Sequence, residues 1–338
     1  MRIPASAARY TANIQVRNQV ISADRVVITG GAGFIGSALA RAVLASAERV
    51  AVIDNLLTGS MENLEDIRDR VDFHHVDIRD RAALESVFAA GDVVFHLAAI
   101  PSVPRSIDEP VPSHEVNIDG AFNVFRAAGQ AGARRVIYAA SSSAYGDTQV
   151  LPKVETMAPQ PKSPYAAQKL MGEYYASVFA SCFGLETVSL RFFNVFGPRQ
   201  DPSSPYSGVI SLFMTAVLDR RSPVIYGDGE QSRDFTYVED VCALLLKAAS
   251  TPAISGRVYN AGNGERYSLN QLWSELQKIE GVNIPATYEA PRAGDVRHSQ
   301  ADVTAAVRDL GHRPRFSFAE GLRATLEWYR PRVAVART

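Results

Sequence analysis

The sequence is poor in cysteine, in net charge and in long apolar runs. Cys182 and Cys242 stand in no CxxC or Cys/His cluster, so neither a disulfide framework nor a zinc site is indicated, and a reducing, cytoplasmic setting is expected. The 35 basic and 36 acidic side chains leave a formal net charge of -1, which provides no basic field for nucleic acid or for a membrane surface. No apolar run is long enough to span a bilayer. We therefore expect a globular protein that binds neither nucleic acid nor membrane.

The first 24 residues contain several arginines and alanines and no acidic residue before Asp24. They resemble a transit peptide only faintly and contain no signal-peptide apolar core. We expect residues 1–24 to form a short N-terminal leader, or a helix outside the first strand, and we assign them no function.

From Arg25 onward, apolar runs rich in β-formers alternate with helical stretches. The expected strands are "RVVITG", "VAVIDN", "VDFHHVDI", "DVVFHLAA", "RVIYAASS" and "ETVSLRFF", and the expected helices between them cover 34–47, 81–90, 115–131 and 165–183. Continuous apolar character is typical of strands covered on both faces, and the alternation predicts βαβ units. The fold class is therefore predicted to be α/β, with a doubly wound, Rossmann-type parallel sheet.

The pattern changes after Phe193. The segment "NVFGPRQDPSSPYSG" is rich in Pro, Gly and Ser and indicates a long functional loop, which a helix over 209–220 follows. Further on, Ser268 and Gln271 form a plausible capping box at the start of a helix that Gly281 ends. We predict a nucleotide-binding domain over 25–193, to which 235–262 returns, and a smaller C-terminal α/β lobe made of 194–234 and 263–330.

A glycine-rich turn joins the first strand to the first helix in "VVITGGAGFIG". Gly30, Gly33 and Gly36 permit a tight turn, and they let backbone N–H groups approach a pyrophosphate at the helix N-terminus. The second strand ends at Asp54, whose carboxylate can accept hydrogen bonds from an adenosine ribose and repels a 2′-phosphate. This pattern favours NAD over NADP. Asp77 and Ile78 end the next expected strand, where an adenine could lie, although Asp77 could equally cap a helix.

Three serines, Ser141, Ser142 and Ser143, follow the strand "RVIYAA", and a Tyr/Lys pair lies about twenty residues later in "SPYAAQK". Tyr165 as a phenolate could remove a proton from a substrate hydroxyl while Lys169, one helical turn on, lowers the tyrosine pKa and holds a nicotinamide ribose. Ser141 could bind the same hydroxyl. A Tyr/Lys pair on an ordinary amphipathic helix is the alternative.

Together, "TGGAGFIG", "HLAA", "SSSAYG", "SPYAAQK", "RFFNVFGP" and "RDFTYVED" resemble the extended short-chain dehydrogenase/reductase family over nearly the whole chain after residue 24. The resemblance implies that Ser141, Tyr165 and Lys169 are catalytic. It also implies an NAD site made, besides the residues above, of Phe34, Ile35, Asn55, Leu97 and Ala98. Family members usually dimerise through two helices, here 115–131 and 165–183, so a homodimer is expected.

Dehydratases of this family carry an Asp-Glu pair where this chain has Ser142 and Ser143, and the sequence is most similar to UDP-N-acetylglucosamine 4-epimerases through "IPSVPRS", "FNVFGPRQDP" and "GDVRHS". The resemblance implies a UDP-sugar substrate whose C4 is oxidised and reduced. The implied substrate-binding residues, in addition to the three serines, are Ser102, Asn194, Val209, Tyr226, Arg233, Arg292, Asp295 and Ser299.

Three alternatives remain open at this point. The first alternative is a UDP-glucose/UDP-galactose 4-epimerase. Enzymes confined to these sugars often carry tyrosine where this chain has Ser299, so the small side chain predicts room for an N-acetyl group instead. Pro101, however, replaces a glycine of some N-acetyl-preferring relatives, which leaves the shape of the pocket there open. The second alternative is a UDP-uronate epimerase or decarboxylase, in which Arg105 could bind the C6 carboxylate. A non-catalytic nucleotide-binding protein is the third possibility. No metal site is expected, because His96 lies inside an apolar run and the adjacent His74 and His75 point to opposite faces of a strand.

Overall fold

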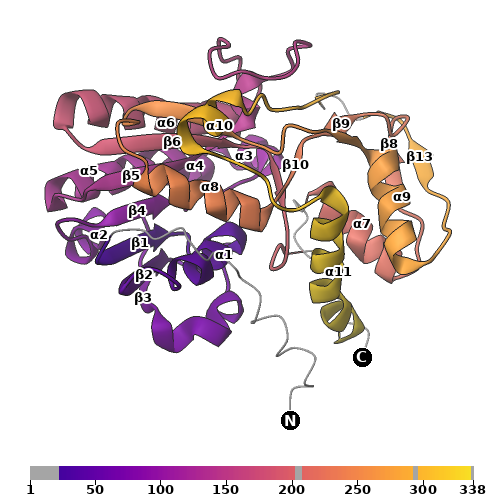
Figure 1. Ribbon diagram of the computed structural model, residues 1–338, viewed down its shortest axis with the longest axis horizontal. Helices are drawn as coiled ribbons and strands as arrows, with labels where there is room; N and C mark the ends of the chain where they lie inside the picture. The colour runs from indigo at the N-terminus through magenta and orange to yellow at the C-terminus, as the bar shows by residue number, and fades with distance from the viewer. Residues whose placement is uncertain (1–22, 202–207, 292–295, 336–338) are drawn as a thin grey trace.

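The computed structural model describes residues 23–201, 208–291 and 296–335 and contains a seven-stranded sheet (Figure 1). The strand order is β11-β6-β5-β4-β1-β2-β3, and every neighbouring pair is parallel. The strands are β1 (Arg25–Thr29), β2 (Arg49–Asp54), β3 (Asp72–His75), β4 (Val93–His96), β5 (Arg135–Ser141), β6 (Glu186–Phe192) and β11 (Arg257–Ala261). The order reverses between β1 and β4, which confirms the predicted doubly wound α/β fold.

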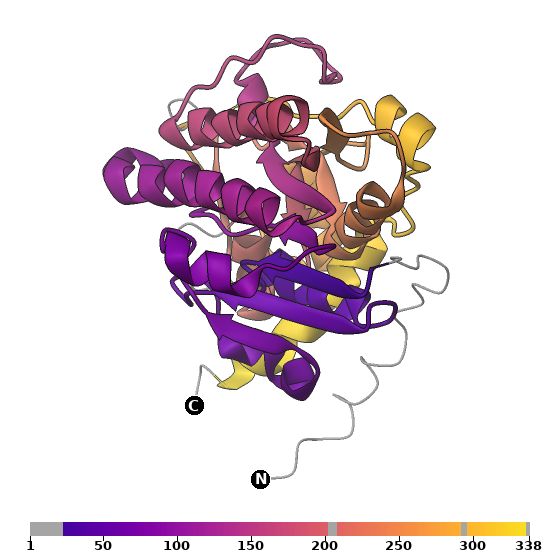
Figure 2. The same ribbon diagram turned by 90° about the vertical axis from the view of Figure 1, so that its left-hand side faces the viewer.

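Alternating residues of β1, β2, β4 and β5 build two separate hydrophobic cores. On β1, Val26 and Ile28 belong to one core, and Val27 belongs to the other, because successive side chains of a strand point to opposite faces. Helices α1 (Phe34–Val43) and α8 (Val238–Ser250) cover the first face, and α2 (Arg81–Val87), α5 (Ala121–Ala131) and α6 (Pro164–Phe183) cover the second. The side-by-side packing of α5 and α6 is visible in Figure 2.

The remaining helices of this part of the chain are short. They are the 3₁₀ helices η2 (Met61–Arg70) and η4 (Ser142–Tyr145), the α-helices α3 (Val103–Asp108) and α4 (Pro110–His114), and the π-helical segment η3 (Glu115–Gly120), which leads directly into α5. The single helix expected over 115–131 therefore begins with a π-helical segment. The expected strand "VDFHHVDI" is also shorter than predicted, because β3 ends at His75 and leaves Asp77 in the following loop.

Beside the sheet, the described residues form a smaller lobe of short strands and helices. Its strand pairs are β7 (Asn194–Phe196) with β10 (Phe235–Tyr237), β9 (Ser232–Arg233) with β12 (Tyr267–Ser268), and β8 (Val224–Tyr226) with β13 (Thr287–Glu289). Its helices are α7 (Val209–Leu218), α9 (Leu269–Glu280) and α11 (Phe318–Val335), whereas α10 (Thr304–Leu310) contacts β11. The predicted capping box of Ser268 and Gln271 is present, and Gly281 ends α9 in the left-handed conformation.

Local sequence explains where α6, the helix that carries the Tyr/Lys pair, begins and ends. The Ser163 hydroxyl accepts a hydrogen bond from the Ala166 N–H at 3.1 Å, and Pro164 occupies the first turn, where a missing N–H costs nothing. Gly184 ends the helix at φ 67°. Within the described ranges, no helix combines the length and the apolar character that crossing a bilayer requires.

Candidate active site

A cleft of about 1130 Å³ opens at the carboxyl ends of the sheet strands and extends to the smaller lobe. It is lined by every residue that the sequence assigned to the cofactor: Gly30, Gly33, Phe34, Ile35, Gly36, Asp54, Asn55, Asp77, Ile78, Leu97, Ala98, Tyr165 and Lys169. Ligands of open α/β sheets bind at this edge, near the point where the strand order reverses.

The glycine-rich turn is a close backbone crossing that side chains would block. Gly30 adopts φ +70°, and a Cβ on it would lie 2.7 Å from the Ala98 nitrogen. A Cβ on Gly36 would lie 2.1 Å from the Gly30 carbonyl oxygen. Helix α1 has Gly33 as its N-cap and therefore no capping side chain, so its first N–H groups are available to an anion.

Asp54 lies at the end of β2, as predicted, and is buried. Its carboxylate accepts hydrogen bonds from the backbone N–H groups of Ala32, at 2.9 Å, and Leu56, at 2.8 Å. Burial raises its pKa, and these two hydrogen bonds act in the opposite direction. The carboxylate thus fixes the glycine-rich turn against the second strand while it lines the cleft.

Asp77 is placed by side chains rather than by a helix terminus. Its carboxylate accepts hydrogen bonds from the Asn55 amide at 2.8 Å and from the Arg79 guanidinium at 2.8 and 3.0 Å. The Arg79 hydrogen bonds hold the pKa of Asp77 at about 2. The helix-cap alternative for Asp77 is wrong, because the N-cap of α2 is Asp80, whose side chain accepts from the Ala83 N–H.

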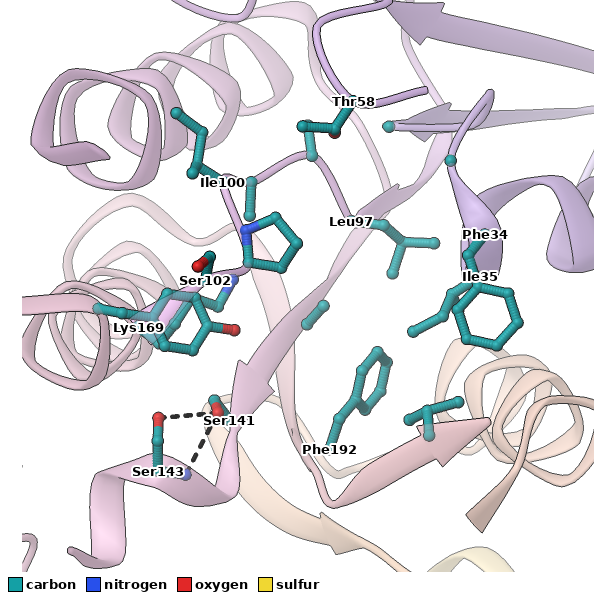
Figure 3. A pocket seen from close by; sticks show the side chains of 18 of the residues that line it. Phe34, Ile35, Thr58, Leu97, Ile100, Ser102, Ser141, Ser143, Lys169 and Phe192 are labelled. Carbon is teal, nitrogen blue, oxygen red and sulfur yellow. Dashed lines mark hydrogen bonds between the residues drawn. The ribbon is translucent and has the colours of Figure 1, made fainter. Parts of the chain in front are cut away.

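The three serines at the end of β5 and the Tyr/Lys pair of α6 all line the cleft. Figure 3 shows Ser141, Ser143 and Lys169 there. The Ser143 hydroxyl and N–H both donate to the Ser141 hydroxyl, at 2.8 and 3.2 Å. Burial raises the pKa of Tyr165, and a hydrogen bond from Ser141 lowers it. The Tyr165 backbone N–H donates to the Ser106 hydroxyl at 3.1 Å, which ties the start of α6 to α3. These contacts place a phenol and a hydroxyl where one substrate hydroxyl could reach both.

Lys169 is buried, with 4% of its surface exposed. Its Nζ lies 4.4 Å from the ring centroid of Tyr138, a residue of β5. Burial lowers the pKa of Lys169 to about 7, and the charge of Glu173, one turn further along α6, raises it. Burial and the Glu173 carboxylate thus act on this amine in opposite directions.

The opposite end of the cleft is built by residues of the smaller lobe. Asn194, Arg233 and Ser299 line it, together with Ser102, Ser142 and Ser143 from the sheet side. The Arg233 guanidinium donates to the Ser232 carbonyl at 3.0 Å, and the Ser299 N–H donates to the same carbonyl at 3.0 Å. Asp234, the next residue, is fully buried and accepts from the N–H groups of Asn263, Gly264 and Ala301. One carboxylate thus joins three segments of the chain beneath this wall.

Not every residue expected at the substrate lies in the cleft wall. Val209 begins α7 and Tyr226 ends β8, and neither is among the described residues that line the cleft. Arg292 and Asp295 lie outside the described residues. The remaining expected substrate residues all line it.

Comparison with known proteins identifies the family. The model of the "NAD dependent epimerase/dehydratase family" matches residues 26–262. The chain belongs to this family. A UDP-glucose 4-epimerase of Mycolicibacterium smegmatis is 38% identical over 90% of this chain and 98% of its own length. The solved UDP-N-acetylglucosamine 4-epimerase of Methanobrevibacter ruminantium is 39% identical, covers 92% of this chain and 99% of its own, and has a TM-score of 0.87. The UDP-glucose 4-epimerase of Thermotoga maritima is 36% identical, over 91% and 99%, with a TM-score of 0.86.

NAD is accordingly the cofactor, and the cleft of this NAD-dependent epimerase/dehydratase fits it. The side-chain-free turn at Gly30 and Gly36, followed by the start of α1, matches the backbone approach that a pyrophosphate needs. Asp54 is the acid expected at an adenosine ribose. The cofactor, when bound, supplies the hydride chemistry.

Sequence reasoning missed several cleft residues, among them Tyr145 and Lys153. Both are buried, and the Lys153 ammonium donates to the Thr148 carbonyl. The Tyr145 hydroxyl donates to the Asn260 side chain at 2.6 Å. A lysine in a polar loop usually indicates solvent exposure, and the partners of both residues are distant in the chain, so no local signal pointed to their burial.

Proposed function

We propose that this chain interconverts UDP-N-acetylglucosamine and UDP-N-acetylgalactosamine by NAD-dependent epimerisation at C4. The observation that carries the proposal is the convergence of Ser141, Tyr165 and Lys169 in the cleft that contains the glycine-rich turn. Membership of the NAD-dependent epimerase/dehydratase family gives the class of enzyme. Ser142 and Ser143 occupy the positions where dehydratases of the family carry an acid and a base, which favours simple oxidation and reduction at one carbon over elimination.

The proposed reaction begins when the Tyr165 phenolate removes the C4 hydroxyl proton, with Ser141 hydrogen-bonded to the same oxygen. Lys169, when protonated, stabilises the phenolate. Loss of hydride from C4 gives a 4-keto sugar, which turns about its diphosphate linkage and accepts the hydride on its other face. Tyr165 then returns the proton to the C4 oxygen. The nucleotide must stay bound throughout this rotation.

The diphosphate is assigned to Arg233 and Arg292, because guanidinium forks match phosphate oxygens. Asn194 is assigned to the sugar or the phosphates, and Asp295 to the uridine ribose. Supporting this, Arg233 and Asn194 line the lobe side of the cleft, opposite the catalytic helix. Ser102, Ser142 and Ser143 line the sugar end.

The N-acetylated sugar is preferred in this proposal because Ser299 lines the cleft with a small side chain. Its backbone is fixed by the hydrogen bond to Ser232, so the position cannot easily withdraw if a larger residue replaces it. UDP-glucose/UDP-galactose remains the runner-up, because relatives of both substrate types are similar to this chain.

A uronate substrate is less well supported. Solved UDP-glucuronic acid 4-epimerases of Bacillus cereus are 30 and 31% identical to this chain. Arg105 lines the cleft and could bind a carboxylate, but its Nε already pairs with the Glu109 carboxylate at 2.9 Å.

The deciding experiment is proton NMR of the purified protein, without added NAD, on UDP-N-acetylglucosamine, UDP-glucose and UDP-glucuronate in separate samples. Formation of the galacto epimer fastest from the N-acetylated sugar supports the proposal. Faster conversion of UDP-glucose would reassign the substrate. No conversion of any of the three, even with NAD supplied, would refute epimerisation and favour a binding protein.

We further propose that the protein is a homodimer. Exposed apolar side chains gather on the outer surfaces of α5 and α6: Phe122, Met171, Tyr174, Val178 and Phe183. Adjacent apolar helix faces of this kind commonly pair with a second copy. Light scattering after gel filtration should give twice the chain mass, and Tyr174→Glu should give monomers. A monomeric wild-type protein would contradict the proposal.

The division of the chain is also a proposal: a cofactor domain over 25–193 with 235–262, and a substrate lobe over 194–234 and 263–330. The pairing of β11 with β6 supports the return of the chain to the first domain. The described cysteines, exposed Cys182 and buried Cys242, are unpaired, which supports a cytoplasmic location.

A further inference from the structure

A buried ion pair begins one helical turn after Lys169, at Glu173. Glu173 of α6 and Arg191 of β6 are each 4% exposed, and they join through two hydrogen bonds, Nε to Oε1 at 2.9 Å and Nη2 to Oε2 at 2.8 Å. The Arg191 guanidinium also stacks 4.6 Å from the centroid of the Tyr145 ring. Burying two charges is expensive, and an apolar pair would often stabilise such a position as well. The pair therefore calls for a role besides stability.

The position of the pair on α6 suggests that role. Tyr165, Lys169 and Glu173 are spaced by four residues, so they lie along one stripe of the helix. At one end of this stripe, two hydrogen bonds from the Arg191 guanidinium hold the Glu173 carboxylate against the sheet. At the other end, Tyr165 faces the cleft.

Few other groups near Lys169 can balance its charge. Tyr138 of β5, under the amine, is a neutral phenol whose pKa burial raises well above its usual value. His96 of β4 is buried and neutral, because burial lowers its pKa to about 3. Arg191 of β6 is a cation. Tyr165 is the group on which Lys169 acts. Among the described residues, Glu173 is the anion whose charge opposes the effect of burial on the amine.

We propose that Glu173 is a positioning residue for Lys169: its carboxylate, locked to the sheet by Arg191, is the counter-charge that keeps the Lys169 amine protonated toward Tyr165. The inference rests on the proposed function, in which charged Lys169 stabilises the Tyr165 phenolate. Without Glu173, no anion opposes the effect of burial on the amine, and its neutral form is favoured.

The test compares Glu173→Gln with wild type and with Glu186→Gln. The control removes the carboxylate partner of Arg135, in an ion pair that joins β5 to β6 at the end of these strands away from Lys169. From a Lys169 pKa of about 7, a fall of one unit predicts that kcat drops about two-fold at pH 6 and about ten-fold at pH 8. The control should keep the wild-type pH profile. A loss in Glu173→Gln that is equal at all pH values would overturn the inference.

A second readout needs no turnover. NMR titration of 13Cε-labelled lysine, assigned against a Lys169→Met version of each protein, follows the protonation of Lys169. In Glu173→Gln, Lys169 should lose its proton at lower pH than in wild type, and an unchanged titration would count against the proposal. Failure of wild type to convert any UDP-sugar would instead refute the proposed function, because the titration does not depend on substrate.

If Glu173→Gln does not fold, the double variant Glu173→Met, Arg191→Met decides, because it removes both charges and leaves no orphaned ion. It should still shift the kcat profile and the Lys169 titration in the same directions, because the Glu173 charge is absent. A double variant with wild-type behaviour in both measurements would show that the pair is only structural.

Discussion

Replacing Gly172 by alanine should displace the catalytic helix without touching a catalytic residue. A Cβ built on Gly172 lies 2.2 Å from the Tyr138 hydroxyl oxygen and 2.3 Å from the ring carbon that bears it. Ordinary contact begins near 3.4 Å, so about 1.2 Å of space is missing. Tyr138 cannot move aside, because it is fully buried on β5 in the middle of the sheet.

The displacement therefore falls on α6, which carries Lys169 about one turn and Tyr165 about two turns before Gly172. Overpacking of this kind costs roughly 1–3 kcal/mol of stability. A misplacement of about 1 Å in reacting groups can cost on the order of 100-fold in rate. We expect Gly172→Ala to fold, to retain NAD, and to lose about 100-fold in kcat.

The assay is epimerase turnover, combined with thermal unfolding and the absorbance of bound NAD. The matched control is Gly129→Ala in α5, where the nearest atom to the new Cβ is a Leu185 methyl at 3.8 Å. There, alanine should leave kcat unchanged and stabilise the helix by up to about 1 kcal/mol. Wild-type kcat in Gly172→Ala would show that α6 need not hold its present position against the sheet.

Three further outcomes follow from the site. Tyr165→Phe should leave NAD bound and reduce kcat by at least about 1000-fold, the order expected when a general base is removed, and substantial residual turnover would exclude Tyr165 as the base. Ser299→Tyr should suppress turnover of N-acetylated sugars more than that of plain hexoses, and an equal loss in both kcat/KM values would exclude Ser299 as the size gate. Asp77→Asn should lower the free energy of unfolding at pH 7 by on the order of 1 kcal/mol, but hardly at all near pH 2. The reason is that a lowered carboxyl pKa stabilises the folded state above about pH 3.8, and this stabilisation is lost as the pH falls through about 2. Equal destabilisation at both pH values in thermal melts would show that the Arg79 contact does not act through the charge of Asp77.

The parallel sheet and the phosphate turn were predictable because both depend on local patterns. Continuous apolar runs marked the strands, and a strand, a glycine-rich turn and a helix in succession marked the turn at Gly30. Asp54 was placed correctly at the end of β2 for the same reason. β3 was predicted too long, because the chain turns after His75, where Val76 N–H bonds back to the His74 carbonyl. Nothing in the local composition marks that turn.

The residues that the sequence could not place depend on contacts between distant segments. Lys153 is buried because its backbone bridges to Ala301, and Tyr145 because Asn260 accepts from its hydroxyl. The Glu173–Arg191 pair joins a helix to a strand, and sequence spacing does not reveal which arginine meets which acid. Val209 and Tyr226 came from resemblance rather than from chemistry, and the described cleft wall does not include them.

The last strand of the sheet has a consequence for synthesis of the chain. β11 pairs with β6, yet the whole segment from Asn194 to Gly256, including β7, α7 and α8, lies between them in sequence. A ribosome must therefore release Ala261 before the seventh strand can join the sheet. Until then β6 is an edge strand, open to pairing with another chain. Between the emergence of β6 and the arrival of β11, the nascent protein thus exposes a longer and more buried strand as its edge than the finished sheet does.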